Sequence, residues 1–81
     1  MQPAEIQSLL ESSIDDAQVQ VTTDDGRHIA IVVISPAFEG LTPVKKQQLV
    51  YSVLNDAISS GDVHAVQMKT FTPAQWAAQN T

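Results

Sequence analysis

Residues 28–35 read HIAIVVIS, and this run decides the fold because it is apolar at both odd and even positions. It predicts a strand with neighbours on both sides and some cover over both faces. Residues 24–27, DDGR, come just before it, and Asp25-Gly26 is a strong tight-turn signal. Residues 17–23 alternate in the manner of a half-buried strand. The two strands are therefore predicted to form an antiparallel hairpin.

A helix is expected to follow from Thr42. Thr42 can cap it, Pro43 suits its first turn, and Gly61 ends the helical region. Tyr51 is interpreted as a packing residue. The predicted apolar stripe of this helix consists of Val44, Val50, Leu54, Ala57 and Ile58.

The next segment, residues 63–71, alternates again and predicts a third strand. Thr72, Pro73 and Gln75 stand where a capping box begins a last helix. Trp76 is expected to anchor this helix on the sheet.

An amphipathic helix from Pro3 to about Ser13 opens the chain, so the element order is helix, strand, strand, helix, strand, helix. A helical connection between the second and third strands usually makes a right-handed parallel pair. We therefore expect one α+β domain over residues 1–81, with a three-stranded mixed sheet, the second strand in its centre, and helices packed on its faces.

The composition limits what this domain can do. The 81 residues are 43% hydrophobic, carry a net charge of −5 and include no cysteine. Disulfides and thiolate ligands from this chain are therefore excluded. We find no signal peptide or membrane span, which predicts a cytoplasmic protein. The sequence also has no nucleophile elbow, phosphate-binding glycine loop or HExxH motif, so we expect a non-enzyme.

The two histidines are the first feature that goes beyond a generic small domain. His28 opens the second strand and His64 opens the third, so a parallel pair would place both at one end of the sheet. Neighbouring strands are about 4.8 Å apart. A single histidine at a strand end is most often solvated or hydrogen-bonded, and two are too few for a zinc site. The missing ligands would have to come from another molecule, and a [2Fe–2S] cluster shared between two partners would meet that need, because histidines can replace cysteines on one iron of such a centre.

Lys45 and Lys46 begin the long helix and ordinarily form a solvated face. The functional alternative is contact with phosphate or with an acidic partner. The net charge of −5 counts against binding driven by phosphate contacts.

Four stretches resemble the BolA-like family, and most closely a bacterial acid-stress branch of it. They are FEG at residues 38–40, VYSVL at 50–54, VHAVQMKTFTP at 63–73, and Trp76. The similarity covers nearly the whole chain. It implies a class II KH-like fold with the order αββ(α)αβα, which agrees with the elements inferred from the residues.

The resemblance also implies a partner, a monothiol glutaredoxin. In such complexes a [2Fe–2S] cluster is bridged by the glutaredoxin cysteine, a glutathione thiol and two ligands of the BolA-like subunit, which match His64 and His28. The isolated chain is then expected to be monomeric and to carry no cluster. The family is further linked to transcriptional control and stress response. Many relatives carry an Arg-His-Arg-like run where this chain has Lys46-Gln47-Gln48.

Two alternatives to the cluster-sharing adaptor stay open at this point. One is a nucleic-acid-binding regulator that uses Lys45, Lys46 and the helix they begin. The other is a heterodimer with glutaredoxin that holds no cluster.

Overall fold

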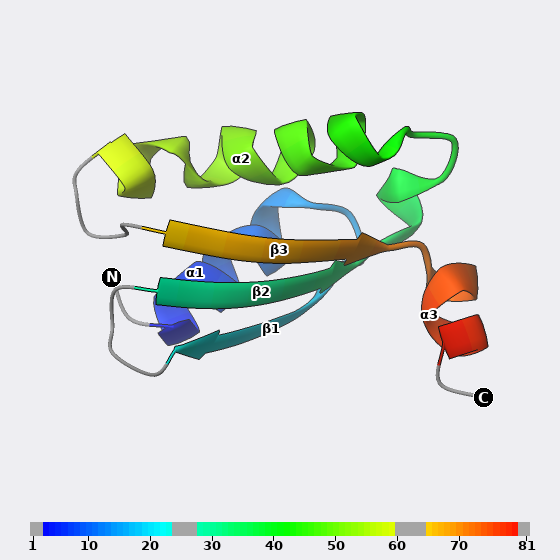
Figure 1. Cartoon of the computed structure of the whole chain (residues 1–81), viewed down its shortest axis with the longest axis horizontal. Coiled ribbons are helices and arrows are strands. Elements are labelled where there is room, and N and C mark those ends of the chain that lie inside the picture. The colour runs from blue at the N-terminus through cyan, green and yellow to red at the C-terminus, as the bar shows by residue number, and fades with distance from the viewer. Residues whose placement is uncertain (1–2, 24–27, 60–64, 80–81) are drawn as a thin grey trace.

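The sheet contains three strands in the order β1-β2-β3 and is mixed. A computed structural model describes residues 3–23, 28–59 and 65–79 of the chain. The strands β1 (Gln18–Thr23) and β2 (His28–Ile34) are antiparallel, and β3 (Ala65–Phe71) runs parallel to β2 (Figure 1). The predicted mixed sheet with the second strand in its centre is confirmed. The predicted turn at residues 24–27 lies outside the described residues.

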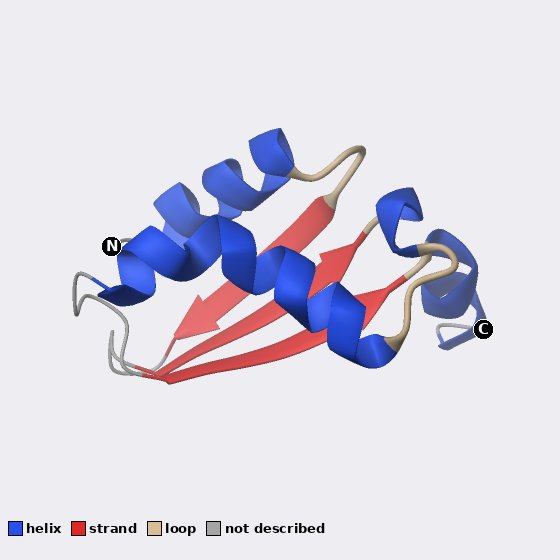
Figure 2. Ribbon diagram, turned by 90° about the horizontal axis from the view of Figure 1, so that it is seen from above, coloured by secondary structure: helices blue, strands red, loops and turns tan. Residues whose placement is uncertain are grey.

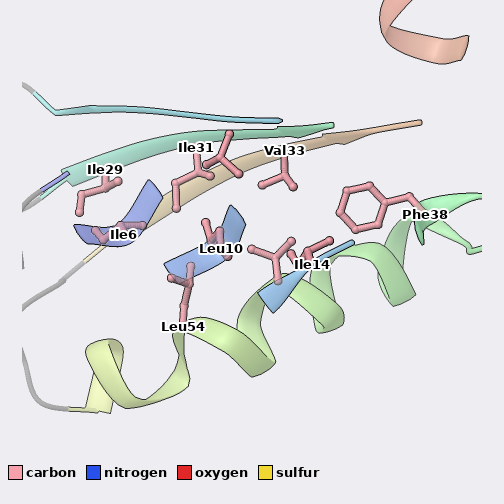
Figure 3. Close-up of a cluster of buried hydrophobic side chains, with 10 residues drawn as sticks. Ile6, Leu10, Ile14, Ile29, Ile31, Val33, Phe38 and Leu54 are labelled. Carbon is pink, nitrogen blue, oxygen red and sulfur yellow. The ribbon is translucent and has the colours of Figure 1, made fainter. Parts of the chain in front are cut away.

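Two helices cover one face of the sheet. They are α1 (Pro3–Ser13), with the bounds expected from the sequence, and α2 (Pro43–Ser59), and Figure 2 shows both on the same side of the strands. Apolar side chains from these helices and from the covered face of the sheet meet between them (Figure 3). The buried members of this core are Ile6, Leu10, Ile14, Val19, Ile29, Ile31, Val33, Phe38, Val50 and Leu54.

The opposite face of the sheet is largely open. Along β2, Ile29, Ile31 and Val33 are buried, whereas Ala30 is exposed and Val32 is only half-buried. The expectation of some cover over both faces of this strand therefore holds only in part: on the second face Ile34 is buried, at 4% exposure, whereas Ala30 is exposed. An open face can carry small apolar side chains such as these, because much of the surface of any folded protein is apolar.

The start of α2 follows the sequence prediction, and its predicted apolar stripe holds in part: Val50 and Leu54 are buried, whereas Val44 is not. Thr42 caps the helix, since its Oγ1 accepts a hydrogen bond from the Lys45 amide at 3.2 Å. Val44 and Tyr51 are exposed, at 63% and 42%, so Val44 does not belong to the buried stripe and Tyr51 is not a core residue. The predicted helix end at Gly61 lies outside the described residues.

The connection between β2 and α2 contains a short 3-10 helix, η1 (Pro36–Phe38), at the position of the bracketed helix that the resemblance led us to expect. Phe38 is fully buried and fixes this connection to the core. Gly40 has a φ of +79°, a backbone conformation that favours glycine.

The last helix, α3 (Pro73–Gln79), lies beyond the ends of the strands (Figure 1). The predicted capping box is confirmed. The Gln75 amide donates to Thr72 Oγ1 at 3.1 Å, and the Thr72 amide donates to Gln75 Oε1 at 2.9 Å. Trp76 packs on Phe71 at the end of β3, with ring centroids 5.3 Å apart, so it does anchor the helix on the sheet.

Candidate functional site

The starts of β2 and β3 form one rim of the sheet. His28 is the first residue of β2, and in the parallel register it stands directly beside Ala65, the first residue of β3. His64 immediately precedes Ala65 in the sequence, but it lies outside the described residues. The structure therefore confirms that the two strands begin side by side. The approach of the two imidazoles stays a prediction.

His28 is exposed, as is Ala30, which lies on the same face of the sheet two residues further along β2. An exposed imidazole at the rim can be reached by another molecule, and its nitrogens are good ligands for iron or zinc. Among the residues that the structure describes, no three histidine, aspartate or glutamate side chains come together as a metal-binding group. A metal bound through His28 would thus need further ligands from residues outside the described part of the chain or from another molecule.

The two lysines at the start of α2 have different environments. Lys45 is exposed, whereas Lys46 is only 7% exposed, so the expectation of a solvated face holds for Lys45 alone. The Nζ of Lys46 donates a hydrogen bond to Gln75 Oε1 at 3.2 Å. This contact joins Lys46 to α3, a segment distant in sequence, so no local signal in the sequence indicates it. A surface for nucleic acid or an acidic partner would have Lys45 as its exposed member of the pair.

Ser35 is a structural residue that the sequence analysis missed. It is fully buried at the end of β2, where its hydroxyl donates to the backbone oxygen of Asp15 and accepts from the Ala37 amide at 3.0 Å. Its own amide donates to the Phe71 oxygen at 3.0 Å. Ser35 thus connects the segment before β1, the end of β3 and η1 at the end of the sheet opposite the histidine rim.

None of the described helices is both long enough and apolar enough to cross a membrane.

Comparisons with known proteins agree with this geometry. The model of the family "BolA-like protein" matches residues 1–75. The acid stress protein IbaG of Escherichia coli K12 is 40% identical over 77 residues, which are 95% of this chain and 90% of that protein.

Two solved structures have the same fold. A BolA protein homologue from Coxiella burnetii has a TM-score of 0.82 and 32% identity, covering 95% of this chain and 97% of that one. The BolA1 protein of Mus musculus has a TM-score of 0.84 and 26% identity, covering 98% of this chain and 71% of that one. Sequence and fold therefore lead to one conclusion: the chain is a member of the BolA-like family.

Proposed function

We propose that the chain is an adaptor that binds a monothiol glutaredoxin and shares a [2Fe–2S] cluster with it, in iron–sulfur handling and stress response. The observation that carries the proposal is the register of the parallel pair, in which exposed His28 stands beside Ala65, the residue that follows His64. This register brings the first residues of β2 and β3 to one rim of the sheet, which supports a site shared by the two histidines.

The chain has enough histidines to ligate one of the two iron atoms of such a cluster. His28 and His64 would ligate one iron, because imidazole replaces cysteine at one iron of some [2Fe–2S] centres. The chain has no cysteine, so the thiolates come from the glutaredoxin and from glutathione. The cluster supplies the iron and the electron-transfer chemistry, and this chain supplies two neutral nitrogen ligands and a surface for the partner.

The likeness to IbaG supports the second half of the proposal. That relative is named an acid stress protein, and the similarity extends over 95% of this chain. Histidine ligation gives a physical reason for such a link, since an imidazole must lose its proton before it binds metal.

Nucleic-acid binding through the start of α2 has less support. Lys46 directs its ammonium group to Gln75, which leaves Lys45 as the exposed cation of the pair, on a chain with a net charge of −5. Protein–nucleic acid affinity depends on several phosphate contacts acting together.

Co-purification with a monothiol glutaredoxin and glutathione tests the adaptor. We expect a complex with the visible absorption of a [2Fe–2S] cluster, and a weakened or altered spectrum in the separate variants His28→Ala and His64→Ala. Ser12→Ala, on the exposed side of α1, is the control, and its spectrum should equal the wild type's. A heterodimer without visible absorption would identify the cluster-free alternative. A cluster spectrum unchanged in both histidine variants would refute the assignment of the ligands.

A further inference from the structure

The sheet face opposite α1 and α2 carries two adjacent rows of accessible side chains. The strand register and the alternation of side chains along each strand define these rows. One row contains Thr22, Ala30 and Gln67, and the next contains Gln20, Val32 and Lys69. Val32 is half-buried, and the other five residues are exposed. We call these six residues the open face.

The open face has different neighbours at its two ends. His28 is exposed and lies two residues before Ala30 on the same side of β2, so the open face continues to the histidine rim. At the other end the next row contains Ile34, which is 4% exposed, and its register partner Phe71, which packs on Trp76 of α3. The open face is therefore bounded by a buried row at one end and is continuous with the candidate site at the other.

The charge of the open face differs from that of the whole chain. The chain has a net charge of −5, but none of the residues in β1, β2 and β3 is acidic. Lys69 is the one charged residue of the open face. Amide and hydroxyl side chains of β1 and β3 flank the small apolar Ala30 and Val32 of β2. This surface is complementary to a neutral, hydrogen-bonding partner surface that presents a carboxylate to Lys69.

The position of the helices leaves a partner at the histidine rim one sheet face to contact. α1 and α2 cover the other face, and Figure 2 shows both on the same side of the strands. Specific protein complexes usually bury about 800 Å² on each partner, far more than contact with one histidine provides. The open face begins beside His28, so it is the adjacent surface that can supply this area.

We propose that the glutaredoxin of the adaptor complex docks on the open face, with Ala30 at the centre of the contact and Lys69 paired with a glutaredoxin carboxylate. Lys69 is the register partner of Val32, which lies about 13 Å along β2 from His28, so the carboxylate belongs at about that distance from the rim. This inference rests on the adaptor function proposed above. It adds the surface and the charge by which this chain recognises its partner.

NMR on the unmodified chain tests where the partner lies. The probe is a monothiol glutaredoxin that carries a [2Fe–2S] cluster and glutathione, and the backbone amides of the labelled chain are followed during its addition. We expect the amides of Gln67 and Lys69 to shift, and those of Ser8 and Ser12 on α1 to stay unchanged. A partner that contacts the rim alone would leave Lys69 unchanged, which would overturn the proposal.

Two substitutions test the open face and leave both histidines in place. Ala30→Arg adds a long charged side chain at its centre and should weaken binding of the same glutaredoxin at least about tenfold in calorimetric titrations. Lys69→Glu reverses its one charge and should weaken binding about fivefold or more at low salt, and by a smaller factor at high salt. Ser12→Arg and Ser12→Glu, on the exposed side of α1, are the matched controls and should bind as the wild type does.

The outcomes distinguish this docking surface from the adaptor function itself. Wild-type affinity in both Ala30→Arg and Lys69→Glu, with the cluster spectrum retained, would overturn the docking surface and leave the adaptor function in place. No complex at all with the unmodified chain would refute the adaptor function and the docking surface together. If Ala30→Arg fails to fold, Lys69→Glu and the amide shifts of the unmodified chain still decide.

Discussion

The ammonium group of Lys46 donates a hydrogen bond to the side-chain oxygen of Gln75 across 3.2 Å and so joins α2 to α3. The same oxygen accepts from the Thr72 amide, so Gln75 belongs to the capping box of α3 and also links α3 to α2.

Replacing Gln75 by alanine should lower the free energy of unfolding by about 1–2 kcal/mol, because the capping box and the contact with Lys46 are lost together. Gln75→Glu is the matched control. Its carboxylate can still accept from Thr72 and adds an ion pair with Lys46, so its stability should equal or exceed the wild type's. Urea unfolding measures both, and equal losses in the two variants would contradict the role of the oxygen acceptor.

Ser35→Ala should lower the free energy of unfolding by about 1–3 kcal/mol, because the Asp15 oxygen and the Ala37 amide both lose the hydroxyl to which they are hydrogen-bonded. Ser12→Ala on the exposed side of α1 serves as the control and should change the free energy of unfolding by less than about 0.5 kcal/mol. Thermal and urea unfolding compare the two. A Ser35→Ala protein as stable as the control variant would show that this buried hydroxyl does not hold the strand ends together.

Gly40→Ala should destabilise the fold through the backbone alone. No atom lies within 4 Å of an added Cβ, but the φ of +79° costs an alanine about 1–2 kcal/mol. Gly40→Asn should lose less stability than Gly40→Ala, because asparagine adopts a positive φ more readily than alanine does. We expect the melting temperature to be highest for the wild type, lower for Gly40→Asn and lowest for Gly40→Ala. A Gly40→Ala protein at least as stable as the wild type would contradict this prediction.

Acidification should weaken the proposed shared-cluster complex. An imidazole must lose its proton before it binds metal, so protons compete with iron for the nitrogens of His28 and His64, and falling pH should weaken their ligation. Visible circular dichroism of the purified complex with glutaredoxin should therefore decrease from neutral to mildly acidic pH. Glutaredoxin with its own cluster and without this chain is the control. A signal that stays flat over the same range would argue against histidine ligation.

Local patterns predicted most of the fold. The bounds of α1, the cap at Thr42 and the box formed by Thr72 and Gln75 depend on neighbouring residues, and the structure agrees with each of them. The mixed sheet follows in the same way from the hairpin and the helical crossover.

Features set by distant contacts were not predictable. An apolar run such as IAIVVI does not indicate which face of the sheet the helices will cover. In the structure they cover the face with Ile29 and Ile31, and Ala30 on the other face is exposed. Lys46 and Ser35 are both buried, and each makes a hydrogen bond to a residue distant in sequence, Gln75 and Asp15 respectively. At the candidate site, the sequence predicted the common rim of the two strands. The pairing of His28 with Ala65 agrees, while His64 lies outside the described residues.

The parallel neighbours β2 and β3 come from different halves of the chain, and this has a consequence for folding. α1, β1 and β2 follow one another and can assemble early, whereas β3 can add only after α2 has crossed back over the sheet. We therefore expect β3 and α3 to join last and to detach first in local unfolding. A molecule bound at the start of β3 would stabilise the strand that we expect to detach first. Binding at that rim should therefore raise the free energy of unfolding of the whole domain.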